Sequence, residues 1–452
     1  MLKFFKAVIR RPVFLVVPAL CFLAFVAGAF VTEFRWFPYA FVFQDAFTYI
    51  RATAERRNEE GEAMAEAERG AAKPTGDVTI KATPQAFDGY TFLTYETGRP
   101  STARLIDMDG KVVHEWHRPM RDIWKKPPHK SNPSPETSVA WRYGELFPNG
   151  DIIVVLVGYG DTPNGYGLVK LDKDSNVIWQ LAENFHHHFS IAEDGRIFGM
   201  THDWRDAKKG RVKGARRLPG KVLEDFIVEV SPDGKVLSRT SLTEAMAAPG
   251  FRDLMSSAFF NGYWTNPWDP LHPNDVEVIT ADFAAKHPSI MKAGSVLVSL
   301  RDLDALVLLD PKTKQVTWSQ RGPWLRQHDP DLLDNGNILV FDNRGDRTAK
   351  RGGSRLIEWE PETGKVAWSY LGTDDHPFLS SKNAAVERLP NGNTLVTEDD
   401  NGRVFEVTKA GEIVWEYRDV RMHQASRVTR DWIKFAPGGP VKAPVAAAET
   451  HR

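Results

Sequence analysis

The sequence has one cysteine in 452 residues, Cys21, and it lies in an apolar N-terminal segment. One cysteine excludes an intramolecular disulfide and a CxxC metal site, and its position excludes a cysteine nucleophile in the rest of the chain. The chain also carries almost no net charge. It has 58 Lys plus Arg and 59 Asp plus Glu, which give a formal charge of -1. This balance excludes a global field that attracts nucleic acid or an anionic membrane. Any anion site must therefore be built locally.

Long apolar runs are missing except near the N-terminus, where residues 12–32 carry no charge and follow a basic stretch at 1–11. This length can cross a hydrocarbon core of about 30 Å. We therefore predict a cytoplasmic basic tip and membrane anchor over 1–50, with the rest on the periplasmic, extracytoplasmic side. A signal peptide cleaved near Ala27-Gly28-Ala29 is the alternative, and a buried core helix is a third interpretation.

Residues 51–84 begin with a segment rich in Ala, Glu and Arg that predicts an exposed helical stalk, followed by a linker containing Pro and Gly. Residues 421–452 are interpreted as a C-terminal extension that ends in a disordered tail, because their last part is rich in Pro, Gly and Ala. These boundaries leave 85–420 as the main domain.

A hairpin unit recurs through 85–420. Apolar runs follow turns at Asp88-Gly89, Asn149-Gly150, Asp194-Gly195, Asn335-Gly336 and Asn391-Gly392, and a divergent copy occupies 275–300. Asn-Gly and Asp-Gly favour hairpin turns because the turn needs positive φ at its central residues. A second hairpin, whose last strand usually contains Trp, follows each first one. Two hairpins per repeat predict an all-β, six-bladed β-propeller, with 85–96 closing the ring against the last blade.

Propellers bring equivalent positions of their inner strands together around a central channel. Eight residues before each turn glycine stand Lys81, Arg142, His187, His328 and Ala384, and His272 takes this place in the divergent copy. Arginine binds tetrahedral oxyanions with its planar fork, and histidine can act as nucleophile or proton donor. The ring therefore predicts group transfer from an oxyanion ester, although each histidine taken alone also fits a structural role.

The most specific pattern is Gln327-His328 followed by Phe341-Asp342-Asn343 and Arg347, together with His272-Pro273-Asn274 followed by Arg301. In order and spacing it resembles the bacterial arylsulfotransferase family. The resemblance implies a six-bladed propeller that moves a sulfuryl group from an aryl sulfate to a phenol, without a nucleotide donor, through a transiently sulfurylated histidine. It implies catalytic roles for His272, His328 and Arg347. With the ring positions, it makes Arg142, His187, Asn274, Arg301 and Asn343 candidates for substrate binding.

The family's nucleophilic histidine comes late in the chain, and no histidine occurs between His376 and His423. Either His328, His272 or His376 substitutes for it, or the chain does not perform the reaction. The alternative function is a non-catalytic, membrane-anchored propeller that binds an anionic glycan, a lipid or a partner protein. A quinoprotein dehydrogenase, suggested by residues 362–368, is a further alternative.

We expect a small-molecule aryl sulfate and a phenol as substrates, no nucleic-acid partner and no cofactor. No two histidines show the i,i+4 spacing of a helical zinc motif, so no metal site is predicted. The sequence leaves the substrate identity and the oligomeric state open.

Overall fold

The computed structural model describes residues 19–28, 76–81, 83–96, 98–206, 221–247, 251, 254, 269–344 and 353–435. The chain divides into two compact units, and residues 19–28 belong to the first. They form a helix. Among the residues described, we find no helix with the length and apolar character needed to span a bilayer. Most of the predicted anchor, the stalk over 51–75 and the tail from 436 onward lie outside the described residues.

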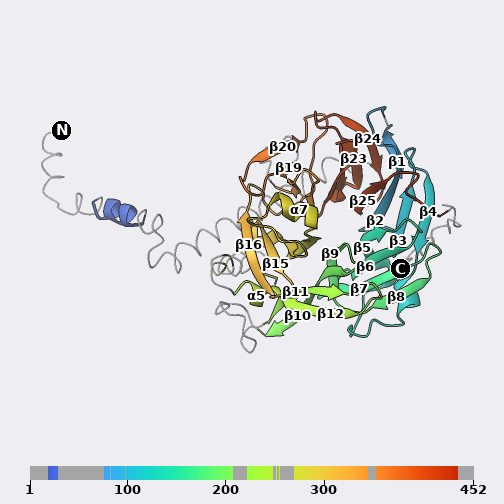
Figure 1. Ribbon diagram of the computed structural model, residues 1–452, viewed down its shortest axis with the longest axis horizontal. Helices are drawn as coiled ribbons and strands as arrows, with labels where there is room; N and C mark the ends of the chain where they lie inside the picture. Colours follow the sequence, from blue (N-terminus) through green and yellow to red (C-terminus); the bar gives the residue numbers. More distant parts are fainter. Residues whose placement is uncertain are drawn as a thin grey trace, which may run out of the picture. The chain divides into compact units, whose positions relative to one another are not determined.

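The second unit consists almost entirely of antiparallel strands in five hydrogen-bonded sheets (Figure 1). Three sheets have four strands each. They contain β9 (Phe185–Ile191), β10 (Ile197–Asp206), β11 (Lys221–Val230) and β12 (Val236–Ser241); β13 (Pro273–Val278), β14 (Val296–Leu300), β15 (Ala305–Asp310) and β16 (Gln315–Arg321); and β17 (His328–Leu332), β18 (Ile338–Asp342), β19 (Arg355–Trp359) and β20 (Val366–Leu371).

The other two sheets hold the first and last strands of the domain. The five-stranded sheet contains β21 (Ala385–Arg388), β22 (Thr394–Glu398), β23 (Arg403–Val407), β24 (Ile413–Arg418) and β1 (Asp77–Ile80). The eight-stranded sheet contains β2 (Tyr90–Tyr95), β3 (Thr102–Ile106), β4 (Val112–His117), β5 (Val139–Leu146), β6 (Ile152–Gly158), β7 (Gly165–Leu171) and β8 (Val177–Leu181), with β25 (Met422–Val428) paired to β2. The strand register between its two halves consists of one pair, Tyr95 and Trp141.

Short helices connect these strands. They are α4 (Met120–Ile123), η2 (Glu136–Ser138), α5 (Leu242–Ala245), α7 (Ala281–Lys286), η3 (Arg301–Leu303) and η4 (Asp399–Asn401).

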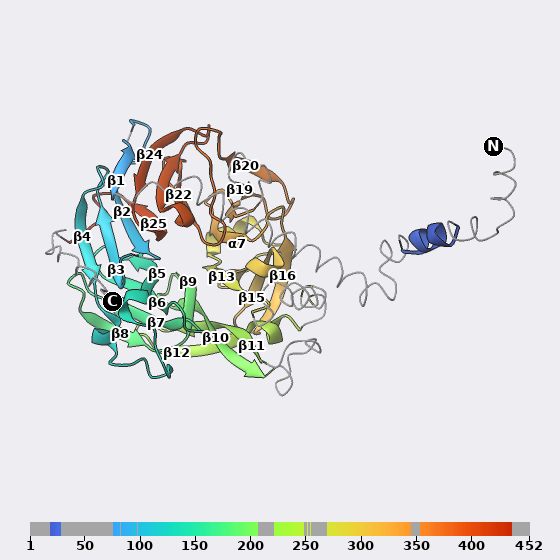
Figure 2. The same ribbon diagram turned by 180° about the vertical axis from the view of Figure 1, so that it is seen from behind.

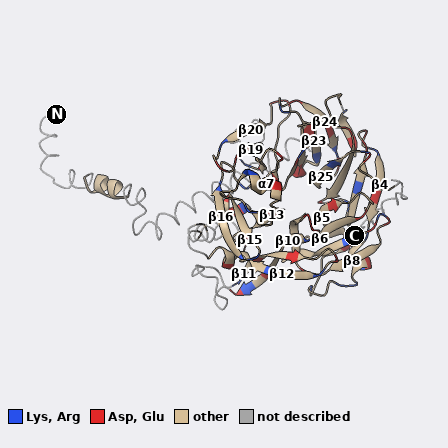
Figure 3. Ribbon diagram, in the orientation of Figure 1, with Lys and Arg blue, Asp and Glu red and all other residues tan. Residues whose placement is uncertain are grey.

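The strands β5, β9, β13, β17, β21 and β25 contact one another in this order, and β25 returns to β5. Figures 1 and 2 show β9 and β25 toward the centre of the domain, and Figure 2 shows β13 there as well. Lys, Arg, Asp and Glu are interspersed over the strands (Figure 3). The prediction of an all-β, propeller-like fold is confirmed.

The predicted closure of the ring is wrong in its details. Residues 85–96 do not join the last sheet, because β2 pairs with β25 on one side and with β3 on the other. The earlier strand β1 instead extends the last sheet by pairing with β24. The sheets therefore reach beyond the predicted limits of 85 and 420. Asp88-Gly89 is not a hairpin turn, and Lys81, directly after β1, is exposed and lies on no inner strand.

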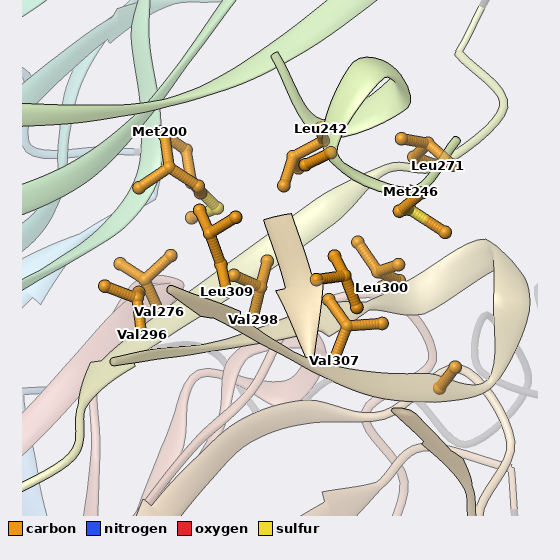
Figure 4. Packing of buried hydrophobic residues seen from close by; sticks show 14 of the residues in the cluster. Met200, Leu242, Met246, Leu271, Val276, Val296, Val298, Leu300, Val307 and Leu309 are labelled. Carbon is orange, nitrogen blue, oxygen red and sulfur yellow. The ribbon is translucent and has the colours of Figure 1, made fainter. Parts of the chain in front are cut away.

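The core lies between neighbouring sheets. Figure 4 shows one such interface, where Met200 of β10, Leu242 of α5 and Val298 of β14 belong to the same buried cluster. Tryptophans also link neighbouring sheets, or the two halves of the eight-stranded sheet, because their indole N–H groups donate to carbonyls of turns that face them. These bonds join Trp116 to Gly150, Trp179 to Pro232, Trp368 to Lys409 and Trp415 to Met108. These tryptophans are therefore packing residues.

Candidate active site

In the inner strands, the strand pairing is interrupted near the positions of the predicted ring. The pairing register skips residues in five of them, namely Arg142 in β5, His187 and His188 in β9, Asn274 in β13, Asp329 and Pro330 in β17, and His423 in β25. Such β-bulges bend a strand and re-aim its side chains. His187, His272 and Asp329 also have φ of 57, 46 and 49°, in the left-handed region that non-glycine residues rarely adopt. We name Arg142, His187, His272, Asn274, His328 and His423 the channel ring.

One cavity brings much of the channel ring together. It is lined by Tyr143, His187, His188, Asn274, His328, Asp329, Ala384, Ala385, His423 and Gln424. The space open to the centre of a water molecule is about 20 Å³, which holds about one water. The predicted residues His187, Asn274 and His328 thus converge, and Ala384 lines the same cavity directly before β21.

His328 offers one free nitrogen. Its Nδ1 lies 2.8 Å from Oδ1 of Asn343 and 3.1 Å from the carbonyl oxygen of Arg326, so Nδ1 carries the proton. Its Nε2 is buried and has no hydrogen-bond partner in the described part of the chain. Burial lowers the pKa of His328 well below its ordinary value, and the charge of Arg301 lowers it further. His328 is therefore a neutral imidazole with an available lone pair.

His187 and His272 face each other with ring centroids 5.1 Å apart. Burial, followed by the charge of Arg142, lowers the pKa of His187 well below its ordinary value. The Nδ1 of His272 lies 2.5 Å from Oδ2 of Asp269. Burial alone would raise the pKa of Asp269, but His272 outweighs it and brings this pKa down to about 2.

The remaining predicted residues take supporting places or lie outside the described part. Asn274 donates from Nδ2 to the carbonyl oxygen of Gln327 at 2.8 Å, and its Oδ1 has no partner. Arg301 begins η3 and donates from Nε to Asp302 Oδ1 at 2.9 Å. Arg347 lies outside the described residues, so its role stays a prediction. His376 is exposed and lies in the connection between β20 and β21, outside the channel ring.

His423 is the functional candidate that sequence reasoning missed, because residues from 421 onward were assigned to an extension. It is buried on β25 beside Arg142, whose Nε lies 3.4 Å from His423 Nε2. On the other side of the ring, Nδ1 lies 3.4 Å from Asp399 Oδ2 and 3.5 Å from Glu96 Oε2. These carboxylates favour a proton on Nδ1, which leaves the Nε2 lone pair toward Arg142. The sequence signal that could have located His423 is the strand-like pattern of Met422–Val428, which no neighbouring hairpin turn connects to a second strand.

Comparison with known proteins identifies the family of this chain. A family model described as "Arylsulfotransferase (ASST)" matches residues 145–420. This chain belongs to the arylsulfotransferase family. The family assignment made from Gln327-His328 and the residues that follow is therefore confirmed.

A search of curated proteins found no match to the chain. Among solved structures, a protein of unknown function from Bacteroides caccae is 14% identical with a TM-score of 0.46, covering 75% of this chain and 98% of that one. A streptogramin B lyase is 12% identical with a TM-score of 0.40, covering 77% and 84%. AztD from Citrobacter koseri is 9% identical with a TM-score of 0.35, covering 76% and 98%. These similarities are too low to bear on function.

The inner strands of this arylsulfotransferase-family protein also carry acidic residues that the sequence analysis did not single out. Burial raises the pKa of Glu145 to about 7 and that of Glu387 to about 8. Burial, with the charge of Asp329, raises the pKa of Glu277 to about 8. Glu145, Glu277 and Glu387 belong to three different inner strands, and each keeps its proton to a higher pH than a free carboxyl group does.

Proposed function

We propose that this protein is an arylsulfotransferase that moves a sulfuryl group from an aryl sulfate to a phenolic acceptor in a channel of six blades. The count of six is supported by the two four-stranded halves of the eight-stranded sheet and by the cycle of six inner strands. The observation that carries the reaction is the position of His423 between Asp399 and Arg142. It supplies the late histidine that the family mechanism requires.

In the proposed first half-reaction, Nε2 of His423 attacks the sulfur atom, an N–S bond forms, and the S–O bond to the aryl group breaks. The phenolate leaves with the bonding electron pair and takes its proton from water. Asp399 faces Nδ1 and stabilises the charge that develops on the imidazole. Arg142 beside Nε2 is placed to bind the sulfuryl oxygens.

In the second half-reaction the acceptor phenol attacks the same sulfur atom, an S–O bond forms, and the N–S bond breaks. The proton of the phenol goes to Nε2 of His328, which is neutral and has no partner of its own. Asn343 holds this ring through Nδ1. We propose that the sulfate contacts His272, Asn274, Arg301 and Arg347. His187 lines the same cavity.

The test is turnover by the purified full chain in detergent, with a nitrophenyl sulfate as donor and a second phenol as acceptor. We expect nitrophenolate release that depends on the acceptor, a new aryl sulfate by mass spectrometry, and without acceptor one sulfuryl group on His423. Absence of transfer with a range of donors and acceptors would overturn the proposal.

The non-catalytic alternative is favoured by one observation. The cavity has room for about one water molecule rather than an aryl sulfate. If anionic glycans or lipid headgroups bind in the channel without turnover, and His423→Ala leaves this binding unchanged, the alternative replaces the enzyme proposal.

We also propose that the uncharged segment 12–32 anchors the chain, with its propeller on the extracytoplasmic side. Protease treatment of intact cells and of spheroplasts tests this proposal. If the segment stays in place as an anchor, we expect the protease to digest the propeller in spheroplasts and not in intact cells. Alkaline extraction should then leave the protein in the membrane fraction. Release into the soluble fraction after loss of the first residues would support the cleaved signal peptide instead.

A further inference from the structure

A second histidine cluster lies beside the channel ring, in the sheet of β9 to β12. His202 on β10 and Asp225 on β11 are direct partners in the strand register. His186 on β9 stacks on His202, with ring centroids 4.2 Å apart and ring planes 25° apart. Its Nε2 lies 3.6 Å from Asp225 Oδ1. One nitrogen of each ring and one carboxylate oxygen all lie within 4.8 Å of one another.

These side chains are buried without the partners that buried polar groups normally have. Relative exposure is 2% for His186, 7% for His202 and 1% for Asp225. Among the residues that the structure describes, the Nε2 atoms of both histidines and both carboxylate oxygens of Asp225 have no hydrogen-bond partner. A buried carboxylate without hydrogen bonds is costly, and native structures rarely keep one without a ligand or a cation. We therefore expect a positively charged group to bind between these three side chains.

Two other groups of buried histidines and carboxylates in the described residues make more contacts with the protein. In the group of Glu96, Asp399 and His423, Arg142 and Arg421 supply the positive charge. In the group of His188, Asp275 and Glu277, both oxygens of Asp275 also have no hydrogen-bond partner among the described residues, but His188 Nδ1 approaches the Val276 carbonyl at 3.2 Å and Glu277 accepts from Ser190. The His186 group differs because the atoms that face each other have no such contacts.

We propose that His186, His202 and Asp225 bind a divalent first-row transition-metal ion. Two imidazole nitrogens and one carboxylate form the ligand set of catalytic zinc sites and of sites that hold iron on one face. Zinc fits this set without a redox requirement, so it is the ion we test first. The helical spacing used in the sequence analysis did not reveal the site, because its ligands come from three neighbouring strands.

The outer contact of His186 links the metal site to the channel ring. His186 Nδ1 lies 2.7 Å from His187 Nδ1. Metal-bound histidines typically donate their second ring N–H to a neighbouring acceptor, which fixes the orientation of both groups. With metal on Nε2, His186 would donate from Nδ1 and make His187 carry its proton on Nε2, toward the channel. The ion would thus position a ring histidine without touching the substrate.

The test is zinc binding to the full chain, purified and then treated with a chelator. We expect one equivalent of zinc by elemental analysis and calorimetry, and a visible absorption band when cobalt(II) replaces zinc. Asp225→Asn and the milder His202→Gln should weaken binding by about 100-fold or more. Glu224→Gln is the matched control, because this neighbouring carboxylate accepts from Ser241 and Thr243, and it should bind like the wild type.

Thermal unfolding is a second measurement. It distinguishes a metal site from side chains that only support the fold. In chelator, Asp225→Asn should change the melting temperature little, because the amide keeps the size and shape of the carboxyl group. With zinc present the wild type should melt at a clearly higher temperature than the variant, since only the wild type is stabilised by a bound ion. Undiminished zinc binding by both ligand variants, or no zinc binding by folded wild-type protein, would overturn the proposal.

Discussion

The Nε of Arg142 lies 3.4 Å from the Nε2 of His423, although 281 positions separate the two residues in the chain. Arg142 belongs to β5 and His423 to β25, which are adjacent inner strands. Their contact exists only because β25 crosses back to pair with β2. The proposed nucleophile and the proposed sulfate ligand are thus joined by the closure of the ring.

Replacement of His423 by alanine should abolish sulfuryl transfer. Because the nucleophile accepts the group covalently, we expect kcat to fall by about 10³-fold or more. The measurement is steady-state turnover, together with the mass of the intermediate without acceptor. His376→Ala is the control, since this histidine is exposed and outside the channel ring. If the His376 variant loses activity and the His423 variant keeps it, the assignment is wrong.

Replacement of Arg142 by lysine should weaken transfer while keeping the charge. The guanidinium donates to Asn383 Oδ1 at 2.7 Å and approaches His423 at the same time, a planar arrangement that lysine cannot reproduce. We expect kcat/KM to fall about 10- to 100-fold. The surface variant Arg196→Lys should show unchanged kinetics. Equal kcat/KM for Arg142→Lys and wild type would contradict a role in binding the sulfate.

Replacement of Arg427 by methionine should destabilise the closed ring. Arg427 on β25 donates to Glu406 on β23 and to Thr91 on β2, and the side chains of Arg427 and Glu406 are fully buried. Removing the cation leaves a buried carboxylate uncompensated, which costs about 3–5 kcal/mol. Arg430→Met breaks an exposed pair with Asp88 and should cost about 1 kcal/mol or less. Urea unfolding of both variants measures the difference, and equal losses would refute the argument.

Stability should fall as pH rises through the range in which Glu277 titrates. The folded protein raises the pKa of this group from 4.5 to about 8, so between these values the native state holds a proton that the unfolded chain has released. Stabilisation is therefore complete below 4.5 and is lost as pH rises toward 8. Glu277→Gln should raise the free energy of unfolding at about pH 9 and change it little at about pH 4. The exposed Glu412→Gln should show no such dependence, and parallel curves for Glu277→Gln and wild type would refute the shift.

Much of the fold can be read from local sequence. Asn335-Gly336 and its copies mark hairpins that the strand registers contain, because positive φ at the turn glycine is a local requirement. The offset from these glycines also locates Arg142, His187 and His328 on inner strands. It fails at Lys81, because Asp88-Gly89 precedes a strand whose partner is made more than 300 positions later.

The candidate site depends on contacts that no local pattern encodes. In the run His186-His187-His188, a register shift separates neighbouring histidines, so that His186 faces Asp225 while His187 and His188 line the cavity. His423 was hidden because strand pairing across the whole domain decides where Met422–Val428 lies. The sequence alone therefore identifies the members of the channel ring except His423. Only the pairing of β25 with β2 brings His423 into the ring.

The pairing of β2 with β25 has a consequence for how the protein is made. During synthesis β2 emerges early, and its inner edge has no partner until residues 422–428 follow. Until then the nascent chain carries an open sheet edge, a known aggregation hazard. The proposed nucleophile arrives on the same strand that closes this edge. Completion of the fold and arrival of the proposed nucleophile are therefore a single event, and a chain that stops before β25 lacks His423.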